Sequence, residues 1–178
     1  MEIELEKIFL IKEFPADFKN SEHIEIIDIY VPQEADHPHL RIRKLGERCE
    51  MTKKSPIKEG DSSAQYEQTI KLSPEEFETF SKIDGKKLRK YRYYYPWFSG
   101  NVKGKKAEID VYLDDLSGLC VADFEFDSLE DKSNFMMPDF CLSEVTQEEF
   151  IAAGMLAGKK YEDLKPYLEK YHYKKLDI

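Results

Sequence analysis

The sequence predicts a mainly β protein of the α+β class, an eight-stranded antiparallel β-barrel with α-helices on its periphery. Short segments rich in β-branched and aromatic residues recur between turn signals, as is typical of antiparallel sheets. Within them, charged residues of like sign stand two positions apart and share one strand face, while apolar residues occupy the other face. A closed sheet satisfies both patterns, because its charged face lines a water-filled interior and its apolar face packs under helices.

Eight segments carry this strand pattern. They are residues 2–11, 24–31, 39–45, 48–54, 64–71, 87–95, 106–113 and 119–127. The third and fourth are expected to form a hairpin through Leu45-Gly46-Glu47. Ser55-Pro56 opens a polar segment that runs to Ser63 and is expected to form a loop.

Four helices are expected between or after the strands. The segment Ser73-Pro74-Glu75-Glu76 combines an N-cap serine, a first-turn proline and a capping-box glutamate, which predicts a helix start. A second helix is expected after Ser128, and a third is expected to open at Thr146 with Glu149 in the capping-box position. The fourth carries Tyr161, Leu164 and Leu168 at helical spacing.

Length and composition restrict the class of protein. A chain of 178 residues predicts one domain, here 1–178. It is 41% apolar without a bilayer-spanning apolar run, and its N-terminus lacks the basic and apolar stretches of a secretory signal, so a soluble protein without membrane contact is expected. A net charge of -9 disfavours nucleic acid as a partner.

For the three cysteines and for two of the histidines, the sequence favours structural roles over catalytic or metal-binding ones. An odd number of widely spaced cysteines argues against a disulfide framework and favours a cytoplasmic location. Cys49, Cys120 and Cys141 are expected to be small core residues. His37 and His39 flank Pro38, and a polar loop is favoured there over a metal site.

The like-charged pairs are the most informative feature. The acidic pairs are Glu4 with Glu6, Glu108 with Asp110, and Asp123 with Glu125; the basic pairs are Arg41 with Arg43, and Lys90 with Arg92. Any one pair is explained by the solvent face of an ordinary sheet. Repetition in five strands favours a charged lumen instead. Grouped carboxylates need a hard cation such as Mg²⁺ or Mn²⁺ between them, and grouped cations bind a polyanion, so a metal-bound polyphosphate satisfies both.

Six blocks of the sequence resemble, in order, the CYTH superfamily, or triphosphate tunnel metalloenzymes. ELEKIFLI (4–11) resembles the ExExK signature strand, and LRIRKLG with EMTKK (40–54) resembles the paired-arginine strand and its T-x-K. The other blocks are YEQTI (66–70), RKYRYYYP (89–96), AEIDVYLDDLSGLCVADFEF (107–126) and SEVTQEEF (143–150). The family includes class IV adenylate cyclases, thiamine triphosphatases and inorganic triphosphatases, and the resemblance implies a triphosphate inside an eight-stranded tunnel.

The resemblance also implies roles for individual residues. Implied metal ligands are Glu4, Glu6, Asp123 and Glu125, with contributions from Glu67, Glu108 and Asp110. Implied triphosphate-binding residues are Arg41, Arg43, Lys54, Lys90 and Arg92. Glu4 and Glu6 are also implied in catalysis, and Tyr30 resembles a family tyrosine near the attacking water.

Ile8 departs from the family pattern, because it occupies the position of the signature lysine. The neighbouring Lys7 points to the other face of a regular strand, but a β-bulge would turn it inward and make it the catalytic lysine. The expected function is a metal-dependent phosphohydrolase, using Mg²⁺ or Mn²⁺, that acts on inorganic triphosphate, thiamine triphosphate or ATP, as a monomer or homodimer. The alternatives are a cyclase that makes cyclic AMP from ATP and, because of Ile8, a catalytically weak polyphosphate- or nucleotide-binding module.

Overall fold

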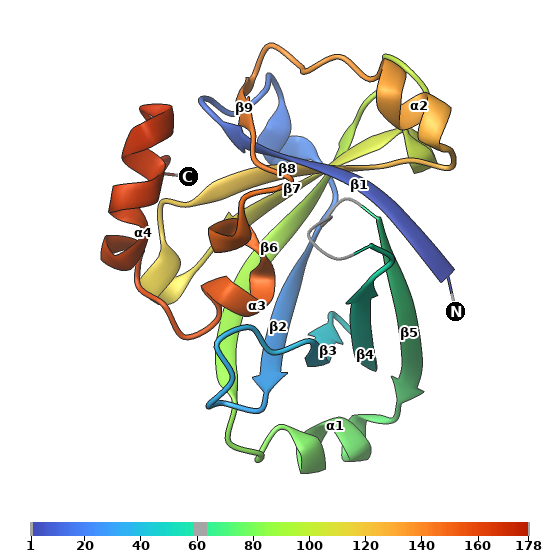
Figure 1. The fold of residues 1–178 in the computed structure, drawn as a ribbon, viewed down its shortest axis with the longest axis vertical. Helices are drawn as coiled ribbons and strands as arrows, with labels where there is room; N and C mark the ends of the chain where they lie inside the picture. Colours follow the sequence, from blue (N-terminus) through green and yellow to red (C-terminus); the bar gives the residue numbers. More distant parts are fainter. Residues whose placement is uncertain (1, 59–63, 178) are drawn as a thin grey trace.

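The computed structural model describes residues 2–58 and 64–177, and within these residues eight strands form a closed antiparallel barrel (Figure 1). The strands are β1 (Glu2–Ile11), β2 (His23–Val31), β3 (Leu40–Leu45), β4 (Arg48–Pro56), β5 (Ala64–Leu72), β6 (Lys86–Pro96), β7 (Lys106–Tyr112) and β8 (Cys120–Glu125). Their order is β5-β4-β3-β2-β6-β7-β8-β1, and pairing of β5 with β1 closes the ring. The predicted fold class and all eight predicted strands are confirmed, and no strand end is displaced by more than two residues. Residues 59–63 of the expected polar loop lie outside the described residues, and β4 extends further into it than predicted.

A ninth strand, β9 (Cys141–Glu144), lies outside the ring and was not predicted. One edge of β1 pairs with β8, and the other edge is divided between β5 at residues 2–5 and β9 at residues 9–11. Its four residues, CLSE, do not alternate between apolar and polar side chains, so sequence alone does not reveal β9.

Three of the four predicted helices are confirmed. α1 (Pro74–Phe80) begins with the predicted capping box, in which Ser73 Oγ accepts a hydrogen bond from the Glu76 N–H at 3.2 Å and the Glu76 carboxylate accepts one from the Ser73 N–H at 2.7 Å. α2 (Leu129–Asn134) follows Ser128, and α4 (Tyr161–Leu168) is the fourth predicted helix. Short 3₁₀ turns occupy Phe18–Asn20, Lys103–Lys105, Asp114–Leu116, Glu149–Ile151 and Glu169–Tyr171.

The predicted helix start at Thr146 is wrong. The side chain of Thr146 accepts a hydrogen bond from the Ile8 N–H of β1 at 3.0 Å, instead of capping a helix. Helical structure therefore begins only with the 3₁₀ turn at Glu149 and continues in the short α3 (Ala153–Leu156).

Much of the outer face of the barrel is apolar and covered, as expected, but Ile3 of β1 and Ile70 of β5 are more than half exposed. Ile29 and Ile42 pack against Phe77 of α1, which lies below β3, β4 and β5 in Figure 1. On the other side of the molecule, Phe9 and Phe124 pack together with Phe135, the residue that follows α2.

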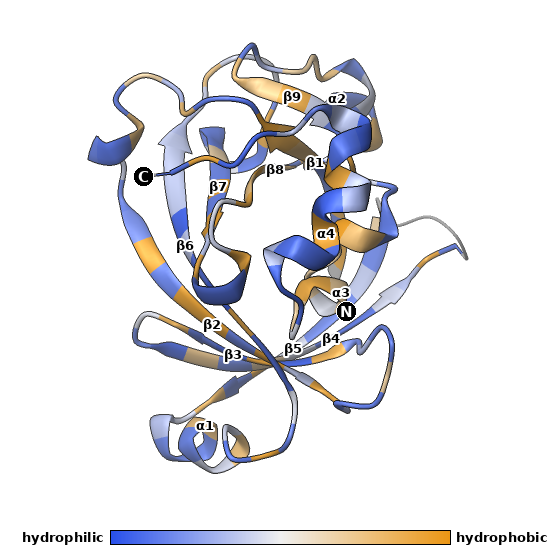
Figure 2. Cartoon of the chain, turned by 90° about the vertical axis from the view of Figure 1, so that its left-hand side faces the viewer, coloured by the Kyte–Doolittle hydropathy of each residue, from blue (hydrophilic) through white to orange (hydrophobic). Residues whose placement is uncertain are grey.

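The two C-terminal helices have a different place from the one expected. In five strands, the lumen face changes along the strand from charged to apolar, and the apolar residues join one buried cluster with α3 and α4. These lumen-side residues are Leu10, Tyr30, Leu88, Tyr112 and Val121. Leu156 of α3 and Leu164 of α4 complete the cluster, so both helices close one end of the barrel rather than cover its outer wall; Figure 2 shows them on the side that faces the viewer.

The three cysteines are buried and unpaired, which confirms their interpretation as core residues. In the described part of the chain, no helix is long and apolar enough to cross a membrane.

Candidate functional site

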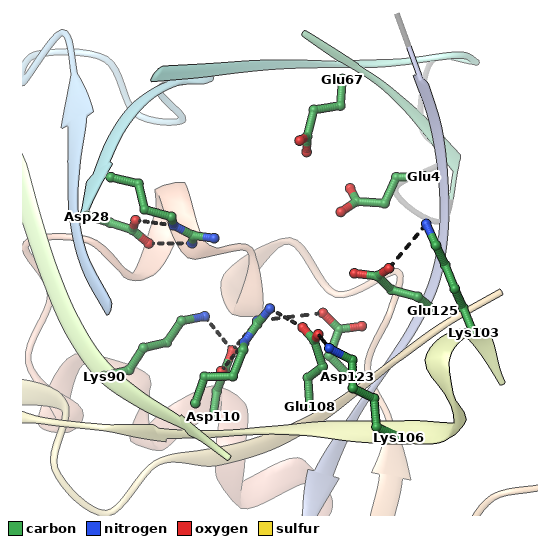
Figure 3. Close-up of polar contacts among 12 residues, drawn as sticks. Glu4, Asp28, Glu67, Lys90, Lys103, Lys106, Glu108, Asp110, Asp123 and Glu125 are labelled. Carbon is green, nitrogen blue, oxygen red and sulfur yellow. Dashed lines mark hydrogen bonds and ion pairs between the residues drawn. The ribbon is translucent and has the colours of Figure 1, made fainter. Parts of the chain in front are cut away.

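Strand register brings the acidic side chains of β1, β5, β7 and β8 to one side of the lumen. Glu6 stands opposite Glu125, and Glu108 stands opposite Asp123. We call this set the acidic group, and its members are Glu4, Glu6, Glu67, Glu108, Asp123 and Glu125. In Figure 3 the labelled carboxylates of this group point toward a common space.

Burial and mutual repulsion make this acidic group electrostatically unfavourable as it stands. Burial, with the charges of Glu4 and Glu125, raises the pKa of Glu6 to about 7 against the opposing charge of Lys54. Burial and the charge of Glu6 hold the pKa of Asp123 well above its usual value. Among the described residues, Asp123 Oδ1 is buried without a hydrogen-bond partner. The group therefore favours an added positive charge.

Three lysines partly supply that charge. Lys54 forms an ion pair with Glu4, and its Nζ lies 3.5 Å from Glu67 Oε2. Burial raises the pKa of Glu67, but the charge of Lys54 and other contacts outweigh it, so this pKa is lowered. At the more exposed rim, Lys106 Nζ lies 3.0 Å from Glu108 Oε1, and Lys103 Nζ lies 3.6 Å from Glu125 Oε2 (Figure 3).

The basic side chains of β6 lie beside the acidic group and are held by Asp110 of β7. Arg92 donates from Nε to Asp110 Oδ1 at 2.7 Å and from Nη2 to Oδ2 at 2.8 Å, and its Nη1 contacts Glu108. Lys90, 3% exposed, also donates to Asp110. Burial lowers the pKa of Lys90 to about 8 despite Asp110. Both oxygens of Asp110 are thus engaged by cations, so the structure places this residue with the basic side chains.

Arg41 and Arg43 project from β3 toward Asp28, a partner that the pattern of like-charged pairs did not predict. Arg43 donates from Nε and Nη2 to the two oxygens of Asp28 at 2.6 and 2.7 Å, and Arg41 Nε lies 4.0 Å from Asp28 Oδ1. Asp28 is completely buried. Its signal was the single acidic residue in the apolar run IIDIY, on the same strand face as Tyr30. We call Arg41, Arg43, Lys90 and Arg92 the basic group.

Tyr30 lies at the boundary between the basic group and the apolar closed end of the barrel. It stands opposite Arg41 in the β2–β3 ladder and packs in the cluster with Leu10 and Tyr112. Burial and then the charge of Asp28 raise its pKa, so its hydroxyl keeps its proton.

Lys7 is not brought to the lumen. The pairing of β1 with β8 is regular from Glu6 to Leu10, and the register shift on this strand falls between Leu10 and Ile11. Lys7 therefore points outward, with Nζ 3.4 Å from Glu144 Oε2. No bulge turns it inward, and Ile8 shares the lumen face with Glu4 and Glu6.

The described residues contain no group of three His, Cys, Asp or Glu side chains arranged closely enough to hold a metal ion as they stand. The rings of His37 and His39 lie 4.5 Å apart, and His37 Nδ1 lies 3.8 Å from Glu149 Oε1. In the acidic group, lysines and Arg92 occupy several of the oxygens. The donor chemistry still fits a hard cation, because the group is all carboxylate and includes the unpartnered oxygen of Asp123.

Comparison with known proteins gives one curated relative and several similar structures. The chain is 30% identical over 148 residues, 82% of this chain and 91% of the relative, to an inorganic triphosphatase from Nitrosomonas europaea. The crystal structure of the inorganic triphosphatase NE1496 superposes with a TM-score of 0.60 at 25% identity and covers 89% of this chain and 97% of that one. PH1012 from Pyrococcus horikoshii OT3 shares the fold, with a TM-score of 0.50 at 15% identity over 96% and 91% of the two chains. No family model matches the sequence.

A closed antiparallel barrel with acidic and basic side chains facing each other across its lumen defines a tunnel protein. With the curated relative at this identity and coverage, the chain belongs to the CYTH superfamily, the triphosphate tunnel metalloenzymes.

Proposed function

We propose that this protein hydrolyses a terminal phosphoanhydride bond of inorganic triphosphate, or of a related organic triphosphate, in the presence of Mg²⁺ or Mn²⁺. The observation that carries the proposal is the contact between the acidic and basic groups, at Arg92, inside one buried lumen. The identity to an inorganic triphosphatase supports the same substrate class.

The residues proposed to hold the divalent ion are those of the acidic group, first Glu4, Glu6, Asp123 and Glu125, and then Glu67 and Glu108. A bound ion would neutralise these carboxylates and polarise the phosphoryl oxygens. Asp110 is left out of this set, because the buried cations Arg92 and Lys90 take both of its oxygens. Glu108 is kept, because one of its oxygens is held only by the more exposed Lys106.

The residues proposed to bind the triphosphate are the basic group and Lys54. Phosphoryl transfer requires mainly that the protein position its substrate and neutralise charge on the equatorial oxygens, which guanidinium and ammonium groups do. In the proposed reaction a water oxygen attacks the terminal phosphorus in line, the bridging P–O bond breaks, and diphosphate leaves. Glu6 is proposed to accept the proton that the water loses. Tyr30, which lies beside Arg41, is proposed to donate a hydrogen bond to the attacking water.

Ile8 supports a second candidate function. Its side chain faces the lumen at the place where the family signature has lysine, so the site has one cation fewer. A lumen that binds polyphosphate or nucleotide without efficient turnover is consistent with this feature.

One experiment separates these possibilities. The purified protein is incubated with tripolyphosphate, thiamine triphosphate and ATP, each with Mg²⁺, Mn²⁺ or EDTA, while phosphate and cyclic AMP are measured together. Release of phosphate that requires the divalent ion supports the proposal. Formation of cyclic AMP would assign the chain to the cyclases, and calorimetric binding without release would favour the binding module.

A further inference from the structure

Asp28 is a fully buried carboxylate that faces two cations of the basic group. We propose that Asp28 is a positioning residue, which fixes the guanidinium group of Arg43 in the orientation in which it meets the phosphate groups of the substrate, beside Arg41. This inference rests on the proposed function, because it assigns the residue that prepares the same site for a polyphosphate.

The geometry of the Asp28–Arg43 pair determines which nitrogen of Arg43 is free to meet the substrate. Asp28 and Arg43 are directly opposite each other in the β2–β3 ladder. The two hydrogen bonds use Nε and Nη2, so Asp28 grips the side of the guanidinium and Nη1 points away from it. Asp110 grips Arg92 through the same two nitrogens, which leaves Nη1 of Arg92 to reach across to Glu108. Both arginines are therefore held side-on, with one nitrogen turned away from the aspartate.

Arg41 supplies the second observation. Among the described residues, its Nε is buried without a hydrogen-bond partner and lies 4.0 Å from Asp28 Oδ1. An unpartnered buried donor is costly, and it indicates a site where a further acceptor completes the hydrogen bonds. Phosphate oxygens are such acceptors.

Electrostatics keep Asp28 charged in this place. Burial alone would raise its pKa, but the charge and hydrogen bonds of Arg43, together with Arg41 and Lys90, lower it. A buried ion pair is often no more stabilising than apolar side chains of the same volume. A charged aspartate inside the apolar run IIDIY is therefore better explained by the orientation of its arginines than by stability.

The test compares Asp28→Asn with Asp114→Asn. Asp114 holds Arg89 in the same side-on manner, through Nε at 2.8 Å and Nη2 at 2.6 Å, but on the outer face of β6, so it is a matched control. The dissociation constant for tripolyphosphate is measured by calorimetry, and the melting temperature is measured in parallel. Asp28→Asn is expected to weaken binding tenfold or more, the scale of one charge-assisted hydrogen bond. Asp114→Asn is expected to leave binding within twofold.

A double-mutant cycle tests whether Asp28 affects tripolyphosphate binding through Arg43. In an Arg43→Ala background, Asp28→Asn should weaken binding much less than it does in the wild type, because the arginine through which it acts is absent. Asp28→Glu keeps the charge but displaces it, and it should bind more weakly than wild type. If folded Asp28→Asn binds tripolyphosphate as wild type does, Asp28 is only a structural ion pair and the inference is overturned.

The wild-type protein supplies a readout that does not depend on the folding of any variant. The NMR signal of the Arg43 Nε–H should persist in slow exchange both before and after tripolyphosphate is added, while signals from Nη1 shift. Rapid exchange of the Nε–H in both states would contradict a fixed guanidinium. If wild-type protein fails to bind tripolyphosphate at all, the proposed function fails, and that result is distinct from a wild type that binds with a mobile Arg43.

Discussion

Ile8 of β1 stands directly opposite Asp123 of β8, so an apolar side chain neighbours the carboxylate whose Oδ1 lacks a partner among the described residues. Ile8 also packs against the apolar cluster that closes the barrel. It thus marks the point on β1 where the lumen changes from charged to apolar.

Ile8→Lys should raise the rate of metal-dependent triphosphate hydrolysis. The new ammonium would lie beside Asp123 and Glu6, where it supplies the missing charge, and a positioned acid–base group contributes roughly 10²–10⁴-fold. The measurement is kcat/KM for tripolyphosphate. Lys7→Ala is the control, because Lys7 points outward to Glu144, and its rate should stay within twofold of wild type. A large loss of kcat/KM in Lys7→Ala would show that Lys7 contributes to catalysis although it points outward.

Glu6→Gln and Glu125→Gln should each abolish metal-dependent turnover while the protein remains folded. Each change removes a carboxylate from the acidic group but keeps the side-chain volume. Turnover at limiting Mn²⁺ is the measurement, with the far-ultraviolet circular dichroism spectrum as the check on folding. Glu130→Gln on α2 is a suitable control, since Glu130 is exposed and outside the lumen. Near-wild-type turnover at limiting metal would remove both residues from the proposed metal site.

The metal-free protein should become less stable as the pH rises from about 4.5 to about 7. The unfolded chain releases the proton of Glu6 near pH 4.5, whereas the folded protein keeps it until about pH 7, so deprotonation favours unfolding across this window. Asp123 and Glu125, whose pKa values are also raised, act in the same direction. Melting temperature against pH is the measurement. The slope should be smaller in Glu6→Gln, and added Mn²⁺ should restore stability at pH 7.5; a flat profile in the wild type would contradict the raised pKa of Glu6.

Arg41→Ala and Arg43→Ala should each weaken triphosphate binding by about 1.5–3 kcal/mol, the scale of hydrogen bonds to charged groups. Arg89→Ala is the matched control, because Arg89 lies next to Lys90 on β6 but points outward to Glu25 and Asp114. Calorimetry with tripolyphosphate measures all three. Equal affinities for the three variants would mean that the lumen arginines do not touch the substrate.

Leu164→Ala should destabilise the protein by about 2–5 kcal/mol, because it opens a cavity in the cluster that closes the barrel. Leu129→Ala on α2 is the control, since Leu129 is 68% exposed and its loss should cost little. Urea denaturation measures both. Similar midpoints for the two variants would show that α4 does not pack as the structure has it.

The strands and their faces were predictable because successive side chains of a strand always point to opposite faces. Glu4 with Glu6, and Arg41 with Arg43, needed only the period of two to share a face. The closing helices were harder to place. Leu88 and Tyr112 share the lumen face with Lys90 and Asp110, but only the structure shows that they pack against α3 and α4.

The pairing of charges was not predictable from the same pattern. Asp110 shares a strand face with Glu108, yet Arg92 and Lys90 capture it, and which carboxylate they capture depends on the β6–β7 register. Asp28 has no like-charged neighbour two residues away, so the pattern of like-charged pairs does not include it. The start of the third helix was missed for a similar reason, because the role of Thr146 depends on β1, which is distant in sequence.

The β1–β8 ladder also determines at which point in folding the acidic group is assembled. β6, β7 and β8 follow one another as antiparallel neighbours, whereas residue 6 of β1 must pair with residue 125. Such distant pairings form slowly, because the entropy cost of closing the long intervening loop comes before the contacts that offset it. Until that ladder forms, Glu4 and Glu6 are separated from Asp123 and Glu125, and their repulsion opposes the approach. Forming this ladder and concentrating the negative charge of the lumen are one event, so a divalent cation that binds these carboxylates should also speed folding.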